Sequence, residues 1–151
     1  MVFNDLLQGN ISENIANQHG DFIIQRKDRI IAYQLAVVID DHLQGVNHIV
    51  RGYDLLESTA KQIYLHQLLG YQPPSYMHVP IIVDQHGQKL SKQSFAEPVS
   101  HSNRSQTLWY LLKLLKQSPP QSLATASVKQ ILEWAIENWQ PQNLIAITSV
   151  S

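Results

Sequence analysis

Two lysines and a serine stand close together in the stretch Gly87-Gln88-Lys89-Leu90-Ser91-Lys92-Gln93. A chain-reversing segment, residues 84–87, comes before them and ends at Gly87, so we expect a loop. Lys89, Ser91 and Lys92 offer two cations and a hydroxyl, which could close over a polyphosphate. The same spacing also occurs in ordinary solvated loops, so its meaning depends on the elements before it.

A second candidate site lies at the end of a predicted strand, residues 47–50. Arg51-Gly52 follows this strand and leads into a predicted helix, at the edge where open parallel sheets bind ligands. Arg51 offers a planar fork for a carboxylate or phosphate, although a surface arginine in a turn is the plainer alternative. Tyr33 precedes an apolar segment and could place its hydroxyl in a pocket or simply belong to the core.

The other polar residues do not predict a metal site. Asp40-Asp41 are neighbours whose side chains point in different directions, so a role at a helix end or turn is preferred over a carboxylate dyad. The seven histidines have no zinc-like spacing, and His42, His48 and His78 are interpreted as packing or hydrogen-bonding residues. With no cysteine, disulfides and cysteine-based zinc sites are excluded.

Composition indicates a folded globular chain of 151 residues, 44% apolar and 15% charged. No apolar run has transmembrane length and no signal-peptide pattern is present, so a cytoplasmic location is expected. The net charge of −1 gives no overall basic character, but residues 85–130 hold six Lys or Arg against one Glu. This excess of +5 could face a nucleic acid or be an ordinary solvated surface.

The order of elements predicts an α/β fold. Residues 1–20 read as a connector, and residues 22–33 as a hairpin around a turn at 27–29. Residues 35–39 have both buried-strand and helical character, and periodicity leaves both open. A helix over 54–69, ending at Gly70, separates the strand at 47–50 from the apolar run 77–83. Strand, helix and strand in this order predict a βαβ unit with parallel strands.

The C-terminal part has a different pattern. Residues 102–117 predict an amphipathic helix, with leucines on one side and lysines on the other. Ser127 opens a second helix through Trp139 with capping-box spacing to Gln130, and Pro141 ends it. We therefore expect a small helical subdomain over residues 99–151, after an α/β part over 21–98.

Three stretches in order resemble the class I glutamyl-tRNA synthetases. They are Tyr33-Gln34-Leu35-Ala36-Val37-Val38-Ile39-Asp40-Asp41-His42-Leu43-Gln44-Gly45, Asn47-His48-Ile49-Val50-Arg51-Gly52 and the KMSKS-like Lys89-Leu90-Ser91-Lys92. The resemblance covers about residues 21–93 and is greatest to the glutamyl-Q-tRNA(Asp) group. It implies the second half of a Rossmann-like parallel sheet followed by a small helical subdomain, and it makes residues 35–43 a helix.

The resemblance also implies roles for individual residues. Tyr33 and Arg51 match glutamate-binding positions, and Lys92 matches the ATP-binding lysine, assisted by Lys89 and Ser91. The family activates glutamate with ATP, for which Mg²⁺ is expected, and the glutamyl-Q group transfers it to the queuosine of tRNA(Asp). The implied partners are therefore glutamate, ATP and tRNA(Asp), with no membrane.

Some parts of the family pattern have no counterpart in this chain. The His-x-Gly-His-like element, the early acidic residue and the cysteine-rich zinc insertion are absent, so zinc is expected only in an N-terminal half. We expect the chain to be a C-terminal half that does not activate glutamate alone and self-associates through an open sheet edge. Two alternatives are a fragment of a tRNA-charging glutamyl-tRNA synthetase and a non-catalytic tRNA- or partner-binding protein.

Overall fold

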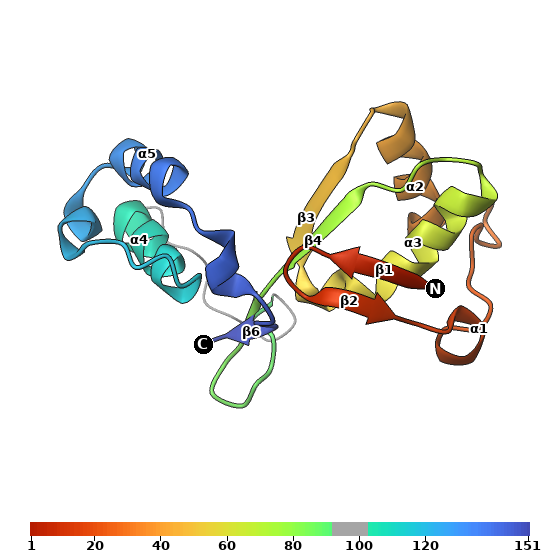
Figure 1. Cartoon of the computed structure of the whole chain (residues 1–151), viewed down its shortest axis with the longest axis horizontal. Coiled ribbons are helices and arrows are strands. Elements are labelled where there is room, and N and C mark those ends of the chain that lie inside the picture. The colour runs from red at the N-terminus through yellow and green to blue at the C-terminus, as the bar shows by residue number, and fades with distance from the viewer. Residues whose placement is uncertain (92–102) are drawn as a thin grey trace. The chain divides into compact units, whose positions relative to one another are not determined.

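The computed structural model describes residues 1–91 and 103–151 as two units, Met1–Val79 and Pro80–Ser151 (Figure 1). The strands are β1 (Val2–Asp5), β2 (Gly9–Ser12), β3 (His48–Gly52), β4 (Ser75–Val79), β5 (Ile81–Ile82) and β6 (Ser149–Val150). The α-helices are α1 (Ile15–Gln18), α2 (Tyr33–Leu43), α3 (Leu56–Leu68), α4 (Arg104–Leu114) and α5 (Val128–Asn138). Short 3-10 helices are Tyr53–Leu55, Gln121–Thr125 and Pro141–Leu144.

The first unit is built on a sheet with strand order β2-β1-β4-β3. β3 and β4 pair in parallel from His48 opposite Ser75 to Gly52 opposite Val79, and α3 connects them. The predicted βαβ unit is therefore confirmed. β1 also runs parallel to β4, with Asp5 opposite Tyr76. The carboxyl ends of β1, β3 and β4 consequently meet at one edge, which is where such sheets bind ligands.

The first twenty residues differ from the predicted connector. Residues 2–12 form the β1–β2 hairpin at the sheet, and residues 15–18 form the short helix α1. The reason is the alternation of the first strand, which turns Phe3 and Asp5 inward while Val2 and Asn4 remain exposed. The predicted boundary between residues 98 and 99 lies outside the described residues.

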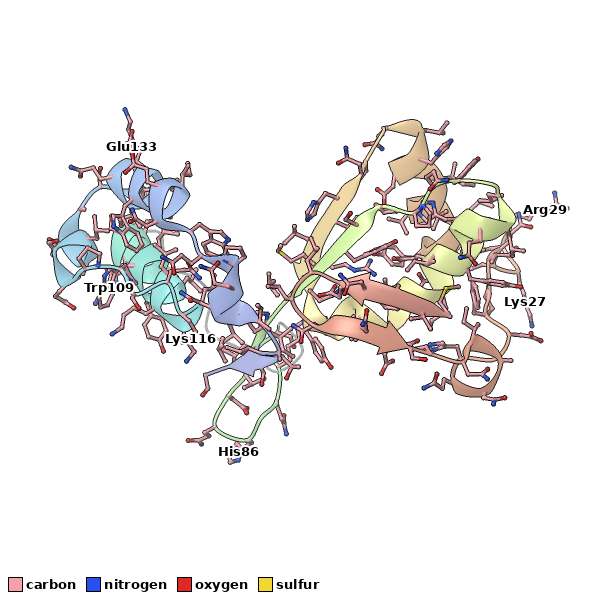
Figure 2. All side chains as sticks on the ribbon, viewed as in Figure 1. Lys27, Arg29, His86, Trp109, Lys116 and Glu133 are labelled. Atoms are coloured by element: carbon pink, nitrogen blue, oxygen red, sulfur yellow. The ribbon has the colours of Figure 1, made fainter. Side chains whose placement is uncertain are left out.

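The segment at 22–33 forms the predicted hairpin in a minimal form. A single antiparallel bridge joins Gln25 and Ile31, and the Ala32 N–H donates to the Ile24 carbonyl. Arg29 has a φ of 67° at the turn, and Figure 2 shows its side chain and that of Lys27 pointing away from the unit. The hairpin leads directly into α2, whose first residue is Tyr33.

Residues 33–43 form one helix, as the family resemblance implied and against the strand alternative. Helix α2 packs beside α3. Gln34 ties the start of α2 to α3, because its amide donates to the Ser58 hydroxyl at 3.1 Å and accepts from the Gln62 amide at 2.9 Å. These two bonds fix the first turn of α2, on which Tyr33 lies.

The predicted helix over 54–69 is confirmed as α3, which begins at Leu56 after a short 3-10 helix. Its buried residues include Leu56, Thr59 and Ile63, which recur at helical spacing, whereas Leu68 is 64% exposed. Gly70 ends the helix with a φ of 71°, and the Tyr71 N–H closes the final turn on the His66 carbonyl at 2.8 Å. The predicted stop is therefore confirmed, and α3 presents a hydroxyl at Thr59 rather than a purely apolar side.

The second unit combines two helices with a two-stranded parallel sheet. β5 pairs with β6, so that Ile81 lies opposite Ser149 and Ile82 opposite Val150. Ser127 and Gln130 form the predicted capping box at the start of α5, and Ile131 and Leu144 are fully buried. Within the described ranges, none of the helices has the length and apolar character that a membrane span requires.

Candidate functional site

Arg51 lies near the carboxyl end of β3, where three parallel strands end together. Its Nε–H donates to His78 Nε2 at 3.0 Å. Its Nη2 donates to the Thr59 hydroxyl at 2.8 Å and to the Leu55 carbonyl at 3.2 Å. The guanidinium carbon is also 5.4 Å from the centre of the Tyr76 ring. Arg51 is therefore fixed by partners on β3's neighbour strand and on α3, unlike an ordinary surface arginine.

Asp5 and His78 form a buried pair behind this arginine. His78 Nδ1 lies 2.6 Å from Asp5 Oδ2, and both side chains are fully buried. Asp5 Oδ1 accepts the backbone N–H groups of Leu7 and Gln8 at 3.0 and 2.9 Å. The strands β1 and β4 therefore bring together two residues that are 73 positions apart in sequence.

The environment favours an ionised Asp5 and a neutral His78. Burial raises the pKa of Asp5, but the hydrogen bonds from His78, Gln8 and Leu7 outweigh it and leave the pKa below its ordinary value. Burial lowers the pKa of His78, and the Arg51 charge acts in the same direction, against the Asp5 carboxylate. The pair therefore carries one negative charge beside the positive charge of Arg51 at neutral pH.

Tyr33 and Tyr76 differ in exposure. Tyr33 begins α2 and is 55% exposed, whereas Tyr76 on β4 is 2% exposed. Burial raises the pKa of Tyr76 to about 12, which Arg51 opposes and Tyr33 and Asp41 reinforce. The Tyr76 hydroxyl has no hydrogen-bond partner among the described residues. Tyr33 and Arg51, the two predicted glutamate-binding residues, thus lie in the same unit, around Tyr76.

The predicted loop that contains Lys89, Ser91 and Lys92, the lysine loop, belongs to the second unit. Asp84 closes its turn, because the Asp84 carboxylate accepts the N–H groups of His86 and Gln88 at 2.8 and 2.9 Å. Gly87 supplies the required φ of 75°, and Figure 2 shows His86 at the tip. The predicted turn at 84–87 is therefore confirmed. Beyond it, Lys89 pairs with Val83 across the hairpin, and the Leu90 N–H donates to the Ile82 carbonyl.

The three predicted residues of this loop are only partly described. Lys89 is exposed and Ser91 is half-buried. Lys92 lies outside the described residues. The base of the loop is bonded to β6, because the Val83 N–H donates to the Val150 carbonyl at 2.9 Å.

The acidic pair and the histidines do not form a metal centre in the described part of the chain. Asp40 and Asp41 lie in the last turn of α2, which agrees with the predicted helix-end position. Across residues 1–91 and 103–151, no three His, Asp or Glu residues are grouped to hold a metal ion. With no cysteine as well, these residues do not fit a zinc site of the family's cysteine-rich kind.

Sequence reasoning did not identify Asp5, Thr59 or the partner of His78. The interpretation of His78 as a packing or hydrogen-bonding residue is confirmed, because both ring nitrogens have hydrogen-bond partners. Asp5 lay in a segment interpreted as a connector, so its pairing was not expected. The available signal was the alternation in Val2-Phe3-Asn4-Asp5 and the place of Thr59 at helical spacing between Leu56 and Ile63.

The chain is similar to known proteins over most of its length. It is 46% identical over 140 residues to a glutamyl-Q tRNA(Asp) synthetase of Thiobacillus denitrificans, covering 93% of this chain and 46% of the relative. It is 45% identical over 137 residues to the one of Pseudomonas aeruginosa, covering 91% of this chain and 47% of the relative. The chain therefore spans about half the length of the curated relatives that it matches.

Solved structures agree on the fold. A glutamate-tRNA synthetase from Elizabethkingia anophelis superposes with a TM-score of 0.71 at 20% identity, covering 99% of this chain and 34% of that one. A glutamate tRNA ligase from Elizabethkingia meningosepticum, in complex with its amino acid, gives a TM-score of 0.68 at 20% identity. The predicted fold class, an α/β part of a class I synthetase followed by helices, is therefore confirmed.

The family model of tRNA synthetases class I (E and Q), catalytic domain, matches residues 1–109. That range includes the hairpin with Asp5, the strands with Arg51 and His78, and the lysine loop. The chain belongs to the class I tRNA synthetases of the glutamate and glutamine group, as part of their catalytic domain.

Proposed function

We propose that this chain supplies part of a glutamyl-Q-tRNA(Asp) synthetase-type site, which activates glutamate with ATP and transfers it to the queuosine of tRNA(Asp). The observation that carries the proposal is the fixed arginine at the carboxyl edge of the sheet. Arg51 holds its guanidinium through three neutral acceptors on His78, Thr59 and Leu55. An arginine supported in this way can bind a carboxylate without first being ordered.

Arg51 also has hydrogen-bond donors left for a substrate. Its bonds to the described residues use Nε and Nη2, and Nη1 has none among them. Nη1 can therefore donate to a substrate carboxylate. Tyr33, on the first turn of α2, would add a hydroxyl for the same substrate.

The proposed reaction joins glutamate to the adenylate group of ATP. A carboxylate oxygen of glutamate attacks the α-phosphorus, the bond to the β-phosphate oxygen breaks, and glutamyl-adenylate and pyrophosphate form. Negative charge on the phosphoryl oxygens is then stabilised by Lys92, with Lys89 and Ser91 beside it in the loop. Mg²⁺ is expected with ATP and would neutralise phosphate charge.

The transfer specificity is proposed from sequence similarity. The relatives at 45–46% identity are named glutamyl-Q tRNA(Asp) synthetases, whereas the structural neighbours at 20% are glutamate-tRNA synthetases. The higher identity over more than nine-tenths of the chain favours tRNA(Asp) as the acceptor over a tRNA that is charged with glutamate at its end.

A chimera tests the proposal. This chain would replace the matching segment of the Pseudomonas aeruginosa relative, of which it covers 47%. We expect glutamate-dependent ATP–pyrophosphate exchange and glutamylation of tRNA(Asp) only when that tRNA contains queuosine. The chain alone, which spans about half of such a relative, is expected to give no exchange.

The variants make the test specific. Arg51→Lys should reduce exchange by about 100-fold, because a lysine cannot reproduce the planar fork. Arg26→Lys is the matched control, since Arg26 is exposed and pairs only with the exposed Asp28 among the described residues. A cooperatively melting chimera without exchange, or one that Arg51→Lys leaves unaffected, would contradict the proposal.

A further inference from the structure

Four side chains from three strands and one helix form a continuous hydrogen-bonded series. It runs from Asp5 on β1 through His78 on β4 to Arg51 on β3, and Thr59 on α3 closes it. The Thr59 hydroxyl lies 3.2 Å from His78 Nε2 as well as 2.8 Å from Arg51 Nη2. Apart from Arg51, which is half-buried, all of these side chains are fully buried. We call them the Arg51 network.

The donors in the network determine the tautomer of His78. Arg51 has only N–H donors, so the Nε–H at 3.0 Å requires His78 Nε2 to be an acceptor. The proton of the neutral ring is therefore on Nδ1, where it donates to Asp5 Oδ2 at 2.6 Å. Thr59 completes the pattern, because its oxygen accepts from Arg51 and its hydrogen can donate to His78 Nε2. In this arrangement each of these contacts joins a donor to an acceptor.

The opposite tautomer would disrupt the contact with Arg51. A proton on Nε2 would face the Arg51 Nε–H, and Nδ1 would present a lone pair to the Asp5 carboxylate. Both contacts are repulsive, and a buried donor without an acceptor is strongly unfavourable. Asp5 therefore acts on Arg51 indirectly: it holds the proton of His78 on Nδ1, so that Nε2 can accept from Arg51.

Asp5 is itself held in position. Its Oδ1 accepts from the N–H groups of Leu7 and Gln8, and from the His78 N–H at 3.3 Å. The Gln8 amide in turn donates to the His78 carbonyl at 2.9 Å. One carboxylate oxygen thus builds the turn after β1, while the other is committed to the imidazole. The two functions can be separated by changing only Oδ2.

We propose that Asp5 and His78 are positioning residues, which fix the imidazole tautomer so that Arg51 keeps Nη1 directed toward a substrate carboxylate. The proposal rests on the proposed function for the identity of that carboxylate. Neither residue touches the substrate. Asp5, Arg51, Asp54 and Tyr76 are the charged or titratable groups that face His78, and the ring of Tyr76 stacks near it at 6.2 Å between centroids.

Nuclear magnetic resonance on the full 151-residue chain tests the tautomer directly. Nitrogen-15 shifts of the His78 ring distinguish a protonated Nδ1 from a protonated Nε2. We expect Nδ1–H in the wild type, together with a slowly exchanging Arg51 Nε–H. In Asp5→Asn, Oδ1 remains for the turn, but an amide N–H replaces Oδ2 and should move the His78 proton to Nε2. Exchange of the Arg51 Nε–H should then become roughly tenfold faster, the factor for a lost hydrogen bond of about 1.4 kcal/mol.

Two further variants keep the inference falsifiable if Asp5→Asn does not fold. His78→Gln places an amide oxygen near Nε2 and should retain protection of the Arg51 Nε–H while losing the bond to Asp5. Thr59→Val should leave the tautomer unchanged, because Asp5 still determines it. An Nε2–H tautomer in the wild type, an unchanged tautomer in Asp5→Asn, or an unprotected Arg51 Nε–H in His78→Gln would each overturn the proposal.

A kinetic measurement on the chimera separates this inference from the proposed function. Asp5→Asn should raise KM for glutamate by about tenfold and leave KM for ATP unchanged, because only the carboxylate contact is misaligned. An equal change in both KM values would overturn the positioning role. If the chimera shows no glutamate-dependent exchange at all, the proposed function fails, whereas the tautomer measured on the chain still decides the inference.

Discussion

Removing the Tyr76 hydroxyl should stabilise the first unit. Tyr76 is 2% exposed, and its hydroxyl has no hydrogen-bond partner among the described residues. A buried polar group without a partner costs about 1–3 kcal/mol, and Tyr76→Phe removes this cost while keeping the ring. We therefore expect the free energy of unfolding to rise by about 1 kcal/mol or more. Most substitutions at buried positions lower it, which makes the sign a demanding test.

The two units can be followed separately during unfolding. The tryptophans Trp109, Trp134 and Trp139 all lie in the second unit, and the first contains none. Tryptophan fluorescence therefore reports on Pro80–Ser151, while five of the six tyrosines report on Met1–Val79. In a urea titration, Tyr76→Phe should move the tyrosine transition up by roughly 0.5–1 M, given the denaturant sensitivity of small proteins.

Tyr64→Phe is the matched control, because the Tyr64 side chain is 39% exposed. Its effect should stay within about 0.5 kcal/mol, as for other surface substitutions. If Tyr76→Phe instead lowers the free energy of unfolding by 1 kcal/mol or more, the hydroxyl makes a stabilising hydrogen bond and the reasoning is refuted.

Three other predictions concern stability. Burial lowers the pKa of His66, although the Asp41 charge acts to raise it, so as pH falls the unfolded chain binds a proton at this histidine before the folded chain does. The free energy of unfolding should therefore decrease as pH drops below about 6.5, the ordinary pKa of histidine. His66→Gln should make this decrease smaller in urea titrations at a series of pH values. Ser127→Ala removes the capping box of α5 and should cost about 1 kcal/mol, measured by tryptophan fluorescence; no change would mean that the box is dispensable. Ile131 is 0% exposed, so Ile131→Ala should cost about 2–5 kcal/mol in the same assay, whereas Leu132→Ala at a 46% exposed position should cost much less.

Local signals in the sequence were sufficient for several elements. Gly70 ends α3 and Ser127 with Gln130 begins α5, because each motif satisfies backbone groups within a few residues. Residues 35–39 show the limit of such signals. Their apolar run fitted a strand or a helix, and the family resemblance gave the helix that α2 confirms.

Long-range pairing explains what the sequence did not reveal. β1 has its long-range partner in β4, where Asp5 lies opposite Tyr76, and Asp5 meets His78 across 73 positions. Likewise, the sequence alone does not show which residues of α3 face the sheet. In the structure the apolar Leu68 is exposed, whereas the polar Thr59 is buried against the sheet. Arg51 was expected to bind an anion from its place after a strand, but its supports on β4 and α3 required the three-dimensional fold.

The pairing of β5 with β6 has an evolutionary consequence. Parallel strands need a long crossover, and here one connection carries both the lysine loop and the helices α4 and α5. Because Ile81 and Val83 are bonded to Thr148 and Val150 at the two ends of that connection, its entry and exit are fixed. Insertions and deletions among the helices at 104–144 can therefore accumulate between lineages without changing the hydrogen bonds at the base of the loop. The turns that join these helices are thus places where this unit can change in length without disturbing the buried Ile131 and Leu144.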